Sequence, residues 1–207
     1  MQESLREIKN RRTHRALAEA AFELAMEHGL DGFVIDDVAS RAGYSRRTFA
    51  NYFSGKEEAV AAAVITEGIA GAVAELGPQS SGGSLLDLLE RIARAQLDER
   101  TIERIAALQE LAQRYPTLLP YLLLTGEGLR ESAAAVIRSH DPSGAGLDTV
   151  LVLHACYGTL STLFTGGLEI VPEGEPRVAG ALTVVEFIDL AFSRLRTGFD
   201  SGPASTT

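Results

Sequence analysis

Apolar side chains recur along this chain with the spacing of α-helices. In the first clear segment they lie three and four residues apart, at Leu17, Ala20, Ala21, Leu24 and Ala25. This spacing places them on one face of a helix. No segment shows the sustained alternation of apolar and polar residues that is typical of a half-buried strand. The pattern therefore predicts an all-α protein.

Two short helices are expected after Gly29, which follows the first helix where a left-handed cap residue is favoured. One of them ends before Gly43 and has its apolar residues at Ile35, Val38, Ala39 and Ala42. The other begins after Ser45, whose hydroxyl suits an N-cap, and buries Phe49 and Phe53 one turn apart. Because Gly43 tolerates a positive φ and Ala39 permits close approach, residues 34–53 have the spacing of a helix-turn-helix.

The rest of the chain is predicted to form a long helix over residues 56–76, a Gly- and Ser-rich connector at 77–84, and several later helices. The later helices are expected over residues 85–98, 101–115, 117–140, 147–166 and 177–197. These elements divide the chain into an N-terminal three-helix domain at 1–56, a C-terminal helical domain at 57–198 and a disordered tail at 199–207.

The outer face of the second short helix carries side chains that suit the edges of DNA bases. Opposite the two phenylalanines lie Arg47, Thr48 and Asn51, and Arg46 reaches outward from the first turn. Arg bonds guanine O6 and N7, Asn pairs with adenine, and Thr contacts a base methyl group or a phosphate. The alternative interpretation is an ordinary helical hairpin with arginines on its surface.

The distribution of charge favours a nucleic-acid partner, although the whole chain has a net charge of -9. Residues 1–58 contain 9 Lys+Arg and 10 Asp+Glu, so most of the negative charge lies later in the chain. One acid, Glu7, accompanies the first basic group, which consists of Arg6, Lys9, Arg11, Arg12 and Arg15. Arg41, Arg46 and Arg47 form a second group. A locally positive face attracts phosphates, but solvated helix surfaces would have the same composition.

Other classes of protein lack support in the sequence. The charged N-terminus has no secretory signal, and the single Cys156 permits no internal disulfide, so a cytoplasmic location is expected. Polar residues interrupt the apolar stretch 147–168, which indicates a buried helix and no membrane partner. His154 and Cys156 lie about 200° apart on a helix, and no enzyme motif occurs. We therefore predict no catalytic site, no metal and no cofactor.

A set of residues carries a family resemblance: Thr13, His14, Arg15, Leu17, Ala20, Ala21, Gly29, Val38, Ala39, Ala42, Gly43, Ser45, Thr48, Phe49, Tyr52, Phe53, Lys56 and Glu57. In this pattern, residues 11–60 resemble the DNA-binding domain of the TetR family of bacterial transcriptional regulators. The Tyr-Phe-x-x-Lys-Glu ending is its most specific part. The remaining 150 residues or so resemble the family only in being helical.

The resemblance implies a homodimer on a partly palindromic operator of double-stranded DNA. It implies that Arg46, Arg47, Thr48 and Asn51 face bases or nearby phosphates, and that Tyr44, Tyr52 and Lys56 hold the DNA backbone. The start of the first helix, with Arg11 and Arg12, would lie along phosphates or in a minor groove. Two positions depart from the family: Val34 replaces a frequent helix-capping Thr, and Ala25 replaces a frequent aromatic, for which Phe22 is the candidate substitute.

The C-terminal domain is expected to dimerise and to bind an effector. The last two helices, apolar on more than one face, predict a homodimer interface, although a large monomeric core would have the same pattern. Candidate effector contacts are the polar and aromatic residues Tyr115, Tyr121, His154, Cys156, Tyr157 and Phe164, each of which is also an ordinary core residue. The composition favours an apolar ligand. Residues 5–13 also resemble regulators of the acyl-coenzyme-A-sensing branch.

The resemblance therefore implies a ligand-responsive transcriptional regulator, most simply a repressor, whose DNA binding a small effector in the C-terminal domain weakens. In the switching hypothesis, a ligand tilts the helix over residues 56–76 and changes the separation of the two recognition helices. The alternatives are a helical protein–protein adaptor and a DNA-binding activator without an effector.

Overall fold

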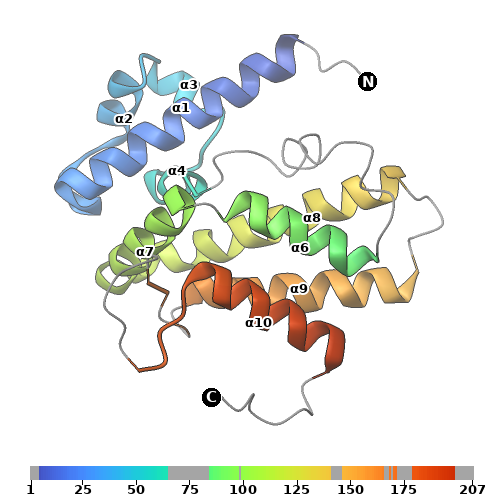
Figure 1. The fold of residues 1–207 in the computed structure, drawn as a ribbon. Coiled ribbons are helices and arrows are strands. Elements are labelled where there is room, and N and C mark those ends of the chain that lie inside the picture. Colours follow the sequence, from blue (N-terminus) through green and yellow to red (C-terminus); the bar gives the residue numbers. More distant parts are fainter. Residues whose placement is uncertain are drawn as a thin grey trace. The chain divides into compact units, whose positions relative to one another are not determined.

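The computed structural model describes residues 5–64, 84–97, 99–140, 146–165, 168, 170–171 and 179–198. Their α-helices are α1 (Leu5–His28), α2 (Ile35–Arg41), α3 (Arg46–Ala50), α4 (Lys56–Ala62), α6 (Leu85–Gln96), α7 (Glu99–Arg114), α8 (Leu119–His140), α9 (Leu147–Thr165) and α10 (Val184–Thr197) (Figure 1). Two single-turn 3₁₀ helices, η1 (Leu30–Gly32) and η3 (Pro116–Leu118), join them. The only β pairing among the described residues is one bridge, between Ile170 and Leu182. The predicted all-α class is confirmed.

The chain forms two compact units. The first consists of residues 1–66 and 104–125, and the second of residues 67–103 and 126–207. α7 and α8 each begin in one unit and end in the other. The first unit therefore extends past residue 56, and the functional domain boundaries given by the sequence stay a prediction.

The first unit is built on α1, against which α2 and α4 pack. The buried residues of α1 repeat every three or four positions and are Thr13, Leu17, Ala18, Ala20, Ala21, Leu24 and Ala25. Residues 5–12 of the same helix are exposed, because no apolar stripe continues through them. Val38, Phe49 and Val60 bring the three following helices into the same core.

The buried Arg104 of α7 joins three elements of this unit. Its guanidinium donates to the Ala63 carbonyl at 2.8 Å, pairs with Glu19 and lies 5.0 Å from the centroid of the Phe22 ring. The ring of Phe22, the candidate substitute for an aromatic at position 25, thus lies against Arg104. Ala25 lines a cavity.

The turn between α2 and α3 depends on Gly43. This residue has φ +75°, and a Cβ built there would contact nothing within 4 Å. The Gly43 N–H donates to Ser40 O at 3.1 Å, and the Tyr44 N–H donates to Ala39 O at 2.8 Å. These bonds satisfy the carbonyls at the end of α2 and direct the chain into α3. The predicted glycine turn is confirmed.

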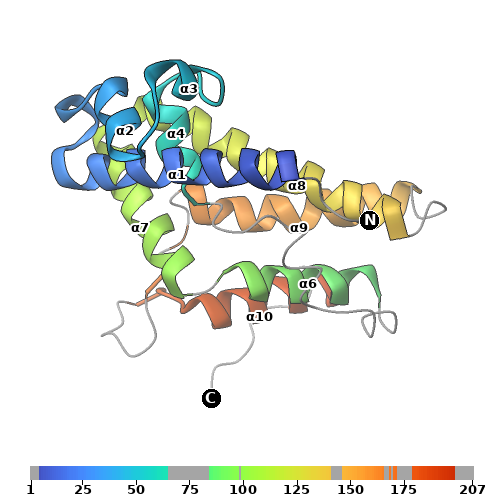
Figure 2. The same cartoon turned by 90° about the horizontal axis from the view of Figure 1, so that it is seen from above.

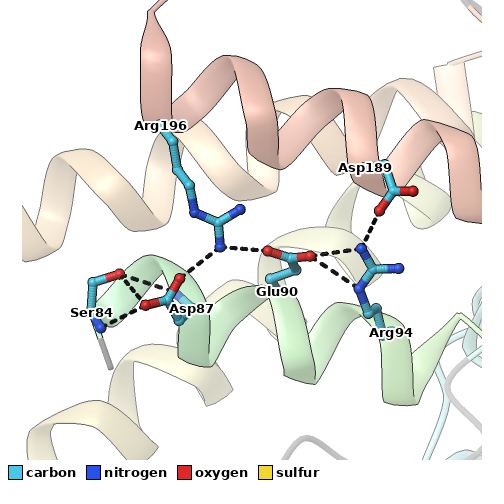
Figure 3. A network of polar contacts seen from close by, with 6 residues as sticks. All are labelled: Ser84, Asp87, Glu90, Arg94, Asp189 and Arg196. Atoms are coloured by element: carbon cyan, nitrogen blue, oxygen red, sulfur yellow. Dashed lines mark hydrogen bonds and ion pairs between the residues drawn. The ribbon is translucent and has the colours of Figure 1, made fainter. Parts of the chain in front are cut away.

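In the second unit, α6 packs beside α10, and both contact α9 (Figure 2). α6 and α10 begin with reciprocal capping bonds, between Ser84 and Asp87 and between Thr183 and Glu186. A chain of ion pairs then joins the two helices (Figure 3). It contains Asp87, Glu90, Arg94, Asp189 and Arg196.

Two helix boundaries differ from those expected. The helix predicted over residues 56–76 begins as expected with α4, which ends at Ala62, where Ala63 and Val64 bond three residues back in a tighter turn. Residues 65–76 of the predicted helix lie outside the described residues. The last helix begins at Val184 rather than near residue 177, because Gly180 has φ +95° and Thr183 caps the helix. The connector at 77–83 and the tail at 199–207 lie outside the described residues.

Candidate nucleic-acid interface

α3 is held against the first unit by two phenyl rings. Phe49 and Phe53 are 1% and 4% exposed, and their ring centroids lie 5.6 Å apart. Burial of such a side chain contributes roughly 1.5–3 kcal/mol to folding. The Ser45 hydroxyl accepts the Thr48 N–H at 3.1 Å and caps the helix. The predicted cap and both anchors are therefore present, and they fix the orientation of the outer face.

The outer face carries two polar side chains that remain exposed, Arg47 and Asn51. Arg47 is the second residue of α3. Asn51 is the C-cap, and its φ of -81° and ψ of -14° continue the helical path by one residue. Thr48 is half-buried, and its hydroxyl lies 2.9 Å from that of Ser45. The structure thus brings the predicted base-reading residues to one surface.

Arg46 is exposed but has a partner inside the protein. Its Nη1 lies 3.0 Å from Oδ2 of Asp36, in the first turn of α2. Arg41, the other basic residue nearby, donates two bonds of 2.7 Å to the Glu27 carboxylate. These bonds hold the pKa of Glu27 below its usual value.

The start of α2 is capped by the protein itself. Val34 occupies the N-cap and has no side-chain acceptor, so it cannot make the bond that Thr would make there. The Val34 N–H donates instead to the Asp37 carboxylate at 2.8 Å. Because Val34 replaces the capping Thr, the reciprocal cap lacks the hydrogen bond that a side chain at position 34 would accept.

The basic residues at the start of α1 line an exposed stretch of helix. Arg6, Lys9, Arg11, Arg12 and Arg15 are all exposed, as a contact with phosphates would require.

His14 of the same helix packs its ring against that of Phe53, with 4.6 Å between the two ring centroids. Partial burial lowers the pKa of His14, and the charge of Glu58 opposes that shift.

The three residues expected to hold the DNA backbone are partly engaged within the first unit. The Lys56 ammonium donates to the carbonyls of Leu30 and Phe33, the second at 3.0 Å, and lies 5.1 Å from the Phe33 ring centroid. The Tyr44 hydroxyl lies 3.3 Å from that of Thr13, and Tyr52 is half-buried. Their contacts with DNA stay a prediction, but each side chain also stabilises the domain.

The predicted effector residues are divided between the two units. Tyr115 lines a cavity of about 400 Å³ in the first unit, together with residues 25–29 and residues of α7 such as Leu111 and Arg114. Tyr121 belongs to the same unit but not to the lining of that cavity. His154 and Tyr157 lie on α9 in the second unit.

The side chains on α9 differ in exposure. His154 is exposed, and its Nδ1 lies 2.8 Å from Val150 O. Cys156 is buried, and burial raises the pKa of its thiol to about 11. Burial also raises the pKa of the Tyr157 hydroxyl. The side chain of Phe164 lies outside the described residues.

Sequence reasoning missed the protein groups that engage the predicted contacts. Asp36, Thr13 and the carbonyls of Leu30 and Phe33 gave no signal, because each partner is separated from its contact by 10 residues or more. Local periodicity does not report such pairs. The capping bond of Asp37, three residues from Val34, is a local signal that was available.

The N-terminal segment matches a known family. Residues 17–63 match the family model for bacterial regulatory proteins of the tetR family. The uncharacterized HTH-type transcriptional regulator YdeS of Bacillus subtilis is 28% identical over 110 residues. That match covers 44% of this chain and 54% of the relative, so the chain spans about half the length of the curated relative.

Solved structures assigned to the TetR family are similar over most of the chain. One from Mesorhizobium loti is 20% identical and covers 91% of this chain and 95% of its own, with a TM-score of 0.44. One from a Rhodococcus species is 15% identical and covers 90% and 97%, with a TM-score of 0.46. A TetR/AcrR-family regulator from Thermobifida fusca is 21% identical and covers 92% and 98%, with a TM-score of 0.41.

The glycine turn, the capped α3 and its exposed polar face define a protein of the helix-turn-helix class. The match over residues 17–63 narrows this class, because this segment is similar to the bacterial regulatory proteins of the tetR family. None of the described helices has the length and apolar character needed to span a bilayer. In the described part of the chain, no three His, Cys, Asp or Glu side chains gather as metal ligands.

Proposed function

We propose that this protein is a cytoplasmic transcriptional repressor that binds a palindromic operator as a homodimer and leaves it when a small effector binds. The observation that carries the proposal is the exposed pair Arg47 and Asn51 on a helix that two buried phenyl rings hold in place. A rigid helix that presents such side chains suits readout of the major groove. The exposed basic stretch of α1 supplies charges for phosphates.

The experiment is selection of duplexes from a randomised library by the full-length protein, followed by protection mapping of the enriched sequence. We expect an inverted repeat whose half-sites are centred roughly 34–36 Å apart or a multiple of that distance. Affinity must also fall steeply with salt, as contacts to phosphates require. Binding without enrichment of any sequence would contradict the proposal and favour a non-specific or adaptor role.

Dimerisation through the last two helices is supported by an exposed apolar surface on each. On α9, Leu147 and Leu151 are 72% and 56% exposed, and Val150 lies on the same side of the helix. On α10, Val185 and Leu190 are exposed. Large apolar side chains that gather at the surface of a helix, as on α9, favour an interface.

For the effector, the cavity lined by Tyr115 supports a site beside α7. Its lining includes the buried Ala25 and Leu111, which suit an apolar group, and also the charged Glu27, Glu110 and Arg114. Arg104 of the same helix bonds Ala63 at the end of α4, so a ligand that moves α7 would also act on α4. Such a ligand shifts the equilibrium only by its difference in affinity for the two forms.

The effector proposal is tested by native mass spectrometry of the purified protein. The wild-type protein is expected to retain a small molecule, and Ala107→Phe, which narrows the cavity, is expected to lose it. Retention by both proteins would exclude this cavity. The other predicted contacts, at Tyr121, His154, Tyr157 and Phe164, would then be the candidates, and the acyl-coenzyme-A-like class stays a prediction.

A further inference from the structure

The arginines near the α2–α3 turn differ in the partners that the structure gives them. Arg41 is committed to Glu27 through two short bonds. Arg46 has a single contact with Asp36. Arg47 is exposed and has no ion pair within the described residues. Of the two arginines that begin α3, one is therefore matched with an acid and the other is not.

We propose that Asp36 determines the specificity of this regulator by keeping Arg46 away from the phosphates of non-specific DNA. The inference rests on the proposed function, because it concerns the same interface. Asp36 is thus a specificity-determining residue, although it offers DNA no attractive contact of its own.

The geometry of the Arg46–Asp36 pair lets Asp36 compete with a DNA phosphate for Arg46. It also lets Arg46 leave Asp36 for a guanine base. Both side chains are exposed, Arg46 by 68% and Asp36 by 58%, and one nitrogen–oxygen contact of 3.0 Å joins them. Exposed pairs of this kind contribute little to stability. A phosphate offers Arg46 a charged partner similar to the Asp36 carboxylate. Replacing Asp36 by a phosphate therefore gains little binding free energy. It also leaves the Asp36 charge beside the negative DNA backbone.

A guanine edge offers more than a phosphate does. Its O6 and N7 accept two bonds in the plane of the guanidinium, which a single carboxylate contact does not match. Arg46 therefore leaves Asp36 more readily at a base that fits than along the backbone. Asp36 penalises non-specific complexes more than the specific one, and unfavourable contacts with wrong partners are a general source of specificity.

Asp37 provides a matched control for Asp36. The two acids are neighbours in the first turn of α2 and carry the same charge. Asp37 makes no ion pair with Arg46 among the described residues, and its carboxylate accepts the Val34 N–H. Asp37→Asn removes one negative charge while keeping an oxygen that can accept this bond. It separates the general effect of charge from the release of Arg46.

The experiment measures duplex affinity by fluorescence anisotropy over a range of salt concentrations. The probes are the most enriched duplex from selection by the wild-type protein and a scrambled duplex of the same composition. Asp36→Asn is expected to free one cation for the scrambled duplex. That adds about 0.9 to the salt slope and raises affinity about fivefold at 0.15 M salt. Affinity for the selected duplex should rise less, so the ratio between the two falls.

The control variants decide the interpretation. Asp37→Asn is expected to raise both affinities by the same factor without changing the salt slope. In an Arg46→Gln background, Asp36→Asn should behave like Asp37→Asn. Thermal unfolding checks that each variant is folded.

Equal effects of Asp36→Asn and Asp37→Asn on both duplexes, with unchanged salt slopes, would overturn the inference while leaving the proposed function intact. Failure of the wild-type protein to bind any duplex would overturn both. If duplexes bind but no sequence is enriched, the proposed function fails. The inference about Asp36 then fails as well, because there is no specific duplex for Asp36 to favour.

Discussion

At the scale of single residues, the candidate DNA interface depends on which polar side chains are exposed and which are bonded to other groups of the protein. Arg47 and Asn51 are exposed at the surface of α3 and its C-cap. Lys56 and Tyr44, by contrast, bond to groups of the first unit. The first pair is therefore expected to act on sequence preference, and the second pair on the stability of the domain as well.

Replacing Arg47 or Asn51 by Ala is expected to relax sequence preference. Loss of one base-reading side chain costs roughly 1–3 kcal/mol on the preferred duplex and little on random DNA. The measurement compares affinities for the selected and scrambled duplexes. Arg12→Ala, at an exposed position on α1, is the control and should weaken both duplexes equally. Equal losses on both duplexes for all three variants would reject the assignment of bases to Arg47 and Asn51.

Replacing Lys56 by Met is expected to destabilise the first unit. The variant keeps an apolar stem but loses two bonds to carbonyls and the contact with the Phe33 ring. Hydrogen bonds from a charged group of this kind contribute about 1–3 kcal/mol in total at a half-buried site. Urea unfolding measures the change, with Lys9→Met at an exposed position as the control. A loss no larger than that of the control would show that the carbonyl bonds contribute little.

At the scale of elements, short local signals and long-range ion pairs hold the helices in place. Gly43 ends α2, and Ser45 begins α3. In the second unit, Arg196 at the end of α10 bonds Asp87 near the start of α6, at 2.7 Å, and also Glu90 (Figure 3). These charged bonds depend on the ionised carboxylates, so the pairing of the two helices must depend on pH.

Stability of the second unit is expected to fall in acid because of Asp87. The bond from Arg196, together with those from Ser84, lowers the pKa of Asp87 from 3.8 to about 2. A lowered folded-state pKa contributes stability above the unfolded value, and this contribution is lost as the pH falls from about 4 towards 2. Urea midpoints of wild-type protein and Asp87→Asn should therefore differ at pH 6 and converge towards pH 2.

Asp31→Asn, an exposed carboxylate of η1, is the control for that comparison. It removes the same charge without removing a bond to Arg196, so its midpoint should follow that of the wild-type protein at each pH. A difference between wild-type protein and Asp87→Asn that stays constant from pH 6 to pH 2 would contradict the proposed role of the ionised carboxylate.

At the scale of the whole molecule, the proposed function requires two copies of the chain, because one α3 would read only one half-site. The exposed apolar residues of α9 and α10 are the surface proposed to join them. They lie in the second compact unit, whereas the reading helix lies in the first. In the proposed function, assembly and DNA recognition would therefore belong to different units.

Leu151→Glu is expected to convert the dimer into a monomer, because a carboxylate at this 56% exposed position would be buried on association. Sedimentation or light scattering measures the mass, and affinity for the selected inverted repeat should fall with it. Leu5→Glu, on the exposed start of α1, is the control and should leave the mass unchanged. A dimer that persists in Leu151→Glu would exclude this surface as the interface.

The sequence predicted the helix-turn-helix because its signals are local. Gly43, Ser45, Phe49 and Phe53 lie within eleven residues, and each has a conformational or burial preference that acts over one helical turn. The capping pair of Thr183 and Glu186 was equally local, so the true start of α10 was available in the sequence. No local signal in the sequence, such as a glycine or a proline, indicated the end of α4 at Ala62.

The pattern of residues along the chain was enough, by itself, to determine an all-α protein, the position of α3 and the face that α3 exposes. Folding decided which basic side chains remain available. Arg46 is matched with Asp36, Arg41 with Glu27 and Lys56 with two carbonyls, whereas Arg47 keeps no ion pair in the described residues. The physical reason is that the interactions of a charged group depend on the neighbours that the tertiary structure brings within about 4 Å, and these come from distant parts of the chain.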